Sequence, residues 1–83
     1  MLSHLMVIAM EQNKLFDSVV LLEDIPTENL RRGNVGAIVE IYKGGEAFEV
    51  EFVDTHGKTY GLLALKPQQF IVLSHESYEL LAA

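Results

Sequence analysis

The stretch "VEIYKGGEAFEVEFVDTHGKTYGLLAL", residues 39–65, alternates apolar and polar residues and is interrupted by glycines at two places. Alternation with a period of two is typical of strands that have one face on a core and the other in water. Glycine supplies the positive φ that tight hairpin turns require. The stretch therefore predicts three consecutive antiparallel strands joined by two turns.

The first turn, at Gly44-Gly45, predicts a register for the first hairpin. A two-residue loop at this point pairs Lys43 with Glu46, Ile41 with Phe48, Val39 with Val50 and Ala37 with Phe52. A slip of one residue would move the buried set to the solvent face. In this register Glu40 lies opposite Glu49 on the outward face, where like charges destabilise a strand pair by up to about 1 kcal/mol.

The second turn, "DTHGK", leaves two registers open. A four-residue turn that ends on a left-handed Gly57, with a bulge, buries Tyr60, Leu62 and Ala64. A two-residue loop at His56-Gly57 buries Gly61, Leu63 and Leu65 instead. Either face carries aliphatic residues, so this strand is expected to be covered on both sides or to expose an apolar patch.

The segments outside the meander complete a small all-β domain. "FDSVVLLED" and "FIVLS" are typical of a first and a last strand, "IPTENLRRGNVG" of a long loop with one helical turn, and "KPQQF" of a tight turn. Five short strands in this spacing predict a small SH3-like five-stranded barrel, with an open barrel of OB type as the alternative. We expect an N-terminal extension over residues 1–14, the barrel over 15–74, and over 75–83 a tail that is either frayed or a short C-terminal helix.

Composition narrows the classes of function. The chain has 83 residues, a net charge of −6 and no cysteine. The acidic balance disfavours nucleic acid and anionic lipid as partners, and the cysteine count excludes disulfides and thiolate metal sites. The opening "MLSHLMVIAM" lacks the basic start of a signal peptide, so we expect a cytoplasmic protein with no membrane association. Met6 or Met10 is an alternative start of the chain.

No residue pattern indicates catalysis or metal binding. His4, His56 and His75 are far apart and lack the i, i+4 spacing of zinc ligands, and His56 is expected to be a turn residue. Nucleophile and phosphate-loop motifs do not occur, and a barrel of this size offers little concave volume. We therefore expect no catalytic residue, no metal, no cofactor and no enzyme activity.

The outward glutamates are the most distinctive polar feature. They are interpreted either as a solvated face that deters edge pairing or as a docking face for a basic protein. The same parity places Ile38 and Val53 on that face, where the chain ends "LMVIAM" and "YELLAA", or a second copy in a homo-oligomer, would cover them. The second hypothesis predicts these partner-binding residues: Glu40, Tyr42, Glu49, Glu51 and Tyr60.

The segments "SVVLLEDIPTENLRRGNVGAIVEIY" and "EVEFVDTHGKTYGLLALKPQQF" resemble a family of small bacterial proteins, common in cyanobacteria, that is known only as a domain of unknown function. The shared pattern is "LLEDIP", "L-x-x-G-x-x-G", "VEF-x-D-x-x-G" and "L-x-P-x-Q", over residues 16–73. The resemblance implies a stand-alone SH3-like domain, encoded in some cases beside other small proteins as in toxin–antitoxin pairs. It implies no catalytic residue and favours an accessory or antitoxin-like role in binding a protein.

The run "LRRGNVGAIVEIY" also resembles the KOW motif of transcription and ribosomal proteins. That resemblance implies a nucleic-acid-binding loop around Arg31 and Arg32, which is the alternative function. The many acidic residues nearby count against it, because they repel phosphate.

Overall fold

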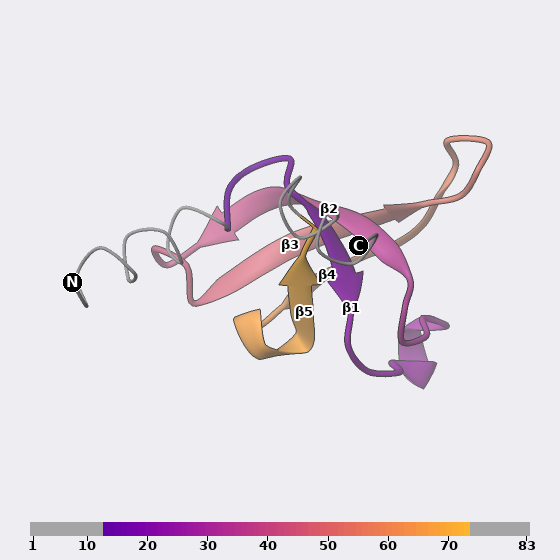
Figure 1. Cartoon of the computed structure of the whole chain (residues 1–83), viewed down its shortest axis with the longest axis horizontal. Helices are drawn as coiled ribbons and strands as arrows, with labels where there is room; N and C mark the ends of the chain where they lie inside the picture. Colours follow the sequence, from indigo (N-terminus) through magenta and orange to yellow (C-terminus); the bar gives the residue numbers. More distant parts are fainter. Residues whose placement is uncertain (1–12, 74–83) are drawn as a thin grey trace, which may run out of the picture.

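The computed structural model describes residues 13–73, and these residues form one five-stranded antiparallel sheet (Figure 1). The strand order across the sheet is β4-β3-β2-β1-β5. No α-helix occurs within the described residues, so the predicted all-β class is confirmed. The elements are β1 (Ser18–Leu21), the 3₁₀ turn η1 (Pro26–Glu28), β2 (Val35–Tyr42), β3 (Ala47–Val53), β4 (Thr59–Leu65), the 3₁₀ turn η2 (Pro67–Gln69) and β5 (Phe70–Val72).

The first hairpin has the predicted register next to its turn. Ile41 pairs with Phe48 and Glu40 with Glu49. The turn is longer than the predicted two residues, because Lys43 as well as Gly44 and Gly45 has positive φ, at 50°, 66° and 110°. The amides of Gly45 and Glu46 both donate to the carbonyl oxygen of Tyr42, at 3.0 and 3.1 Å.

A bulge at Val39 changes the register farther from the turn. The pairing shifts between Ile38 and Glu40, so that Ile38 pairs with Val50 and Gly36 with Phe52. The predicted pairs Val39–Val50 and Ala37–Phe52 are therefore wrong, and so is the outward placement of Ile38, which is fully buried. The bulge brings the larger Ile38 into the core, and it turns Gly36 inward where there is no room for a side chain.

The second hairpin combines parts of both predicted alternatives. Its turn is the longer one: the amide of Asp54 donates to the carbonyl of Lys58 at 2.8 Å, and Gly57 has φ 78°. The register then shifts between Phe52 and Val53, which leaves Tyr60 as an extra residue in β4. As a result the inward face of β4 is Gly61, Leu63 and Leu65, the face that the shorter loop predicted.

Nine apolar side chains form the core, and they come from all five strands and the β1–β2 loop. They are Val19, Leu21, Leu30, Ile38, Phe48, Val50, Phe52, Leu65 and Phe70. The rings of Phe48 and Phe70 meet edge to face with centroids 5.5 Å apart, although β3 and β5 are separated by two strands in the sheet. The sheet is therefore strongly curled, with β1 and β5 crossing the β2–β3–β4 meander (Figure 1), but it is not closed into a barrel.

Some predictions concern residues outside the described part of the chain. These are the possible C-terminal helix, the tail over 75–83, most of the extension over 1–14, His4 and His75. Within residues 13–73 there is no helix with the length and apolar character needed to cross a bilayer.

Candidate partner-binding face

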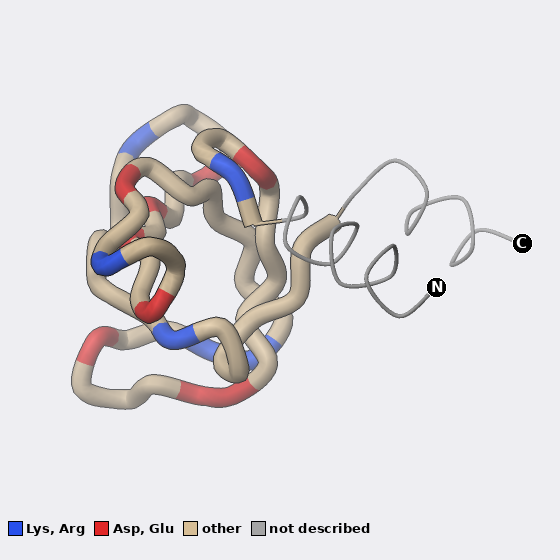
Figure 2. The backbone as a smooth tube through the Cα atoms, turned by 90° about the vertical axis from the view of Figure 1, so that its left-hand side faces the viewer, with Lys and Arg blue, Asp and Glu red and all other residues tan. Residues whose placement is uncertain are grey.

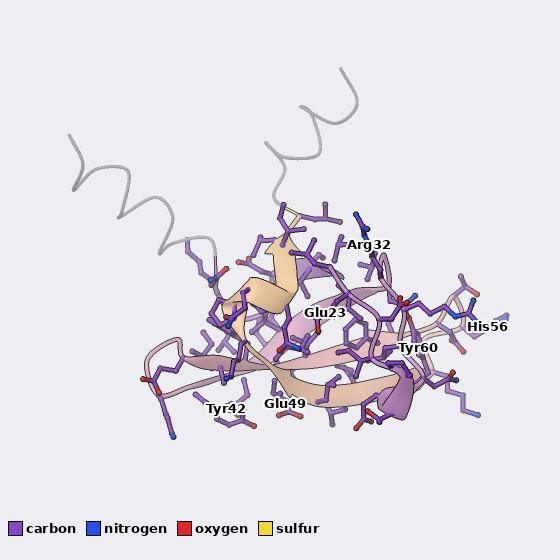
Figure 3. The ribbon with its side chains drawn as sticks, turned by 90° about the horizontal axis from the view of Figure 1, so that it is seen from below. Glu23, Arg32, Tyr42, Glu49, His56 and Tyr60 are labelled. Carbon is purple, nitrogen blue, oxygen red and sulfur yellow. The ribbon has the colours of Figure 1, made fainter. Side chains whose placement is uncertain are left out.

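The side of the β2–β3–β4 meander that points away from the core carries the predicted acidic residues. We call this surface the outer face. Residues of this face form rows that run across the strands. One row contains Glu40, Glu49 and Ala64, and another contains Glu51 and Leu62. Tyr42 lies two residues beyond Glu40 on the same strand. Figure 3 shows Tyr42 and Glu49 projecting together from one side of the sheet, with Arg32 on the other.

Two of the glutamates are held by hydroxyl groups of neighbouring strands. The Tyr42 hydroxyl donates to Oε1 of Glu49 at 3.0 Å, and the Thr59 hydroxyl donates to Oε2 of Glu51 at 2.8 Å. An ionised carboxylate accepts about four hydrogen bonds, so both groups retain capacity for a further donor. The carboxylates are thus oriented while staying open to a cationic group from outside.

The same contact changes the acidity of Tyr42. Its hydrogen bond to Glu49, then partial desolvation, and then the negative charges of Glu49 and Glu40 raise the pKa of the Tyr42 phenol above its ordinary value. Each cause acts against the phenolate. Tyr42 therefore remains a neutral donor to Glu49 throughout the neutral pH range.

Within residues 13–73, no lysine or arginine lies in a strand. All six lysines and arginines of the protein lie in its turns and loops: Lys14, Arg31, Arg32, Lys43, Lys58 and Lys66. The only charged residues within the five strands are Glu40, Glu49 and Glu51. Figure 2 shows the positions of the basic and acidic residues along the backbone tube. The outer face is consequently negative, because its strands carry no basic side chain that could neutralise the glutamates.

Exposed aliphatic residues, together with the half-buried Val20, continue the outer face toward β1 and β5. Val20 pairs with Val35 on one side and with Ile71 on the other, and Val53 follows Glu51 on the outward parity of β3. Val35, Val53 and Ile71 are 48%, 45% and 52% exposed, and Leu62 on β4 is 54% exposed. We call Val20, Val35, Val53, Leu62 and Ile71 the apolar patch.

Four of the five predicted site residues lie together, namely Glu40, Tyr42, Glu49 and Glu51. Tyr60 is apart from them, because it is the extra residue of the β4 bulge and its ring lies against buried Phe52, with centroids 6.2 Å apart. Leu62 and Thr59 also lie on the outer face, next to Glu51, although the sequence did not single them out for binding. The sequence left open whether Leu62 faces inward or outward, and the bulge in β4 is what places it opposite Glu51 with the longer turn.

The Arg31-Arg32 loop lies away from this face and is held by its own hydrogen bonds. The amide of Arg31 donates to Oδ1 of Asn34 and that of Arg32 to Oδ1 of Asp24, both at 2.8 Å. A pocket of about 410 Å³ is lined by Asp24, Pro26, Asn29, Leu30 and Arg31. Its lining therefore includes a carboxylate beside the guanidinium, which weakens its attraction for phosphate.

The remaining polar candidates serve the turns. His56 is exposed, and its amide donates to Oδ1 of Asp54 at 2.8 Å, as expected of a turn residue. Among residues 13–73 there is no group of three histidine, aspartate or glutamate side chains that could hold a metal ion.

Comparison with known proteins gives one match. The domain of unknown function DUF4926 matches residues 15–72, which is most of the chain and includes all five strands. No curated protein and no solved structure matches the sequence or the fold. The matched region contains the whole outer face and the Arg31-Arg32 loop. The chain is therefore a member of the DUF4926 family.

Proposed function

We propose that this protein is a non-enzymatic, cytoplasmic interaction module whose outer face binds a basic protein. The observation that carries the proposal is the pairing of Glu40 with Glu49 on strands that hold no positive charge. An accessory or antitoxin-like role, in which the partner is a basic protein encoded nearby, agrees with the family resemblance of the segments "SVVLLEDIPTENLRRGNVGAIVEIY" and "EVEFVDTHGKTYGLLALKPQQF".

The electrostatics of the face support binding over simple solubility. Like charges directly opposite each other on two strands reduce the stability of the free protein by a few tenths of a kcal/mol to about 1 kcal/mol. A cationic partner relieves this repulsion and is steered toward the face by its field. Because Tyr42 and Thr59 already orient Glu49 and Glu51, little side-chain entropy is lost when the partner binds.

The apolar patch also supports the binding of a protein partner. Interfaces combine an apolar centre with polar surroundings, and the apolar part supplies most of the affinity. Leu62 lies directly across from Glu51, so charge and apolar surface meet on neighbouring strands. A partner that presents both basic and apolar side chains fits this surface best.

We infer an SH3-like arrangement from three features: the strand order β4-β3-β2-β1-β5, a 3₁₀ turn directly before the last strand, and the contact between Phe48 and Phe70 that curls the sheet. In such an arrangement the core is closed by side chains, and the outer strand faces and the loops are available for binding.

The test is a calorimetric titration with the product of the adjacent gene, purified after co-expression. The triple variant Glu40→Gln, Glu49→Gln and Glu51→Gln is compared with the triple variant Glu23→Gln, Glu28→Gln and Glu46→Gln. Both sets change the net charge equally, and the second set is exposed and lies outside the outer face. We expect the first set to weaken binding by about tenfold or more and the second by less than about twofold.

Equal losses in the two triple variants would show that only net charge matters and would refute a specific outer face. The alternative function is tested in the same preparation with single-stranded RNA and with duplex DNA at low salt, where phosphate contacts are strongest. Nucleic-acid binding that falls with salt and with Arg31→Ala, without any binding of the neighbouring protein, would favour the KOW-like alternative.

A further inference from the structure

The two edges of the sheet differ in a way that bears on how a partner binds. β5 forms one edge and has three residues, whereas β4 forms the other and has seven. Among residues 13–73 no strand pairs with the free side of β4. An edge strand presents a row of unpaired backbone N–H and C=O groups that another chain can pair with.

β4 also lacks the features by which proteins usually protect an edge. Short length, charged side chains, proline and bulges are the common devices. The sequence of β4, "TYGLLAL", contains no charge and no proline, and its single bulge is confined to Tyr60 at its start. From Gly61 to Leu65 the strand pairs regularly with β3. Within residues 13–73, these five consecutive residues therefore form a regular edge that none of these devices protects.

We propose that an extended segment of the basic partner adds to the sheet as a sixth strand along Gly61–Leu65. This inference rests on the proposed function and specifies its geometry. The segment alternates basic and apolar side chains, with the basic ones on the side of the outer face. Backbone pairing provides affinity, and the alternate side chains provide selection, as in other cases of strand addition.

Charge complementarity determines which segment fits. Ala64 stands between Glu49 and the added strand, and Leu62 stands between Glu51 and the added strand. Neighbouring strands are about 4.8 Å apart, so the glutamates lie about 10 Å from the added strand. The long stems of lysine and arginine lie over apolar surface with the charge at the tip. A basic side chain can therefore extend over the small Ala64 toward Glu49, which keeps free accepting capacity.

A second copy of the chain is a poorer occupant of this edge. "TYGLLAL" offers no basic side chain, and pairing of β4 with itself would bring the Glu49 and Glu51 rows of two molecules, each with a net charge of −6, to either side of one interface. Like charges in such an arrangement lower affinity. A basic strand from a different protein is attracted instead, because its basic side chains approach the rows that contain Glu49 and Glu51.

The test uses the full chain and a synthetic peptide of about eight residues with alternating lysine and valine. Two isomers of the peptide carry N-methyl groups, one on every lysine amide and the other on every valine amide. They have the same charge and composition. Because successive N–H groups of a strand point to opposite edges, methylation blocks the pairing edge in only one of them. We expect their affinities to differ by about tenfold or more.

Hydrogen exchange locates the binding. With the unmethylated peptide, we expect amides within residues 61–65 that exchange rapidly in the free protein to become protected. Equal affinity of the two isomers, without added protection at 61–65, overturns strand addition. In that case the variant Glu49→Gln distinguishes strand addition from binding at the outer face. If Glu49→Gln weakens peptide binding, strand addition is wrong but the outer face is still the binding surface.

Two other outcomes also count against strand addition. Protection at 61–65 that rises with protein concentration in the absence of peptide shows a second copy on the edge. Failure of the unmethylated peptide to bind even at low salt removes both strand addition and the support for a basic partner, whereas the preceding outcomes remove strand addition alone.

Discussion

At the scale of single residues, the pair Glu40–Glu49 is the feature that local stability does not explain. The two carboxylates face each other across β2 and β3, and only Glu49 receives the hydroxyl of Tyr42. A face selected only for stability would carry an opposite charge at one of these positions. The pair is therefore where selection for stability and selection for binding are expected to conflict.

Removing one charge of the pair should stabilise the free protein. We predict that Glu40→Gln raises the free energy of unfolding by a few tenths of a kcal/mol to about 1 kcal/mol, because it removes the cross-strand repulsion. Urea denaturation measures the change, with Glu46→Gln in the exposed turn as the control. A lower free energy of unfolding for Glu40→Gln than for the control would show that the pair is not repulsive.

The contact between Tyr42 and Glu49 predicts a pH dependence at alkaline pH. The pKa of Tyr42 is raised by this hydrogen bond and by the nearby carboxylates, so its contribution to stability is complete below the ordinary tyrosine pKa of about 10. The contribution is lost as pH rises through the raised pKa of the folded state. We predict that Tyr42→Phe is less stable than wild type near pH 8 and that the difference shrinks toward about pH 11.

Urea denaturation at these pH values measures the difference, and Tyr60→Phe is the control because, within residues 13–73, the Tyr60 hydroxyl makes no hydrogen bond to a carboxylate and its ring lies near Phe52. The account of Tyr42 fails if the difference between wild type and Tyr42→Phe stays constant over the alkaline range.

At the scale of elements, the two bulges decide which side chains are buried. The bulge at Val39 brings Ile38 into the core, and the bulge at Tyr60 selects the inward face of β4. We predict that Ile38→Ala lowers the free energy of unfolding by about 2–5 kcal/mol and that Val39→Ala costs clearly less. Thermal or urea unfolding of the two variants measures this order. A regular hairpin without the bulge requires the reverse order.

Gly36 provides a second measure of how closely the bulged strand approaches its neighbour. A Cβ at this position would lie 2.8 Å from the backbone oxygen of Glu51 and 2.8 Å from a methyl of Val50. We predict that Gly36→Ala costs roughly 1–3 kcal/mol or more, because a backbone atom cannot easily move aside.

Gly61→Ala is the matched control for Gly36→Ala. Its nearest neighbour would be a methyl of Leu30 at 3.1 Å, at the end of a flexible side chain. The smaller obstruction predicts a smaller loss of stability in the same unfolding experiment. Equal losses in the two variants would contradict the close approach of β2 and β3 at Gly36.

The sequence predicts these elements well where polar and apolar residues alternate strictly. In β3 the strict alternation allows only one face to be buried. The structure buries that face, which carries Phe48, Val50 and Phe52, and it leaves Glu49 and Glu51 on the other. Prediction fails where two aliphatic residues are adjacent, as at Ile38-Val39 and Leu62-Leu63, because both parities then look apolar. An extra residue in one strand is undetectable there from the pattern, and the packing around Gly36 and Leu30 settles the outcome.

At the scale of the whole molecule, the fold keeps basic side chains out of the strands. The strands carry three acidic residues and no basic one, whereas all six lysines and arginines lie in loops and turns beside further acidic residues, so one broad surface is negative although basic residues lie near its ends. Four of the five predicted site residues share that surface because they follow the parity of β3 and of the part of β2 next to the turn. The apolar patch was expected in part, but its continuation through Val20, Val35 and Ile71 depends on how β1 and β5 join the sheet.

The most direct test of the central claim is the salt dependence of partner affinity in three proteins: wild type, the triple outer-face variant at Glu40, Glu49 and Glu51, and the equally charged triple variant at Glu23, Glu28 and Glu46. If the outer face binds the basic partner, the fall of affinity with salt is steep in wild type and in the second variant and becomes shallow in the first, because the interacting charges have been removed. The same steepness in both variants would contradict the claim.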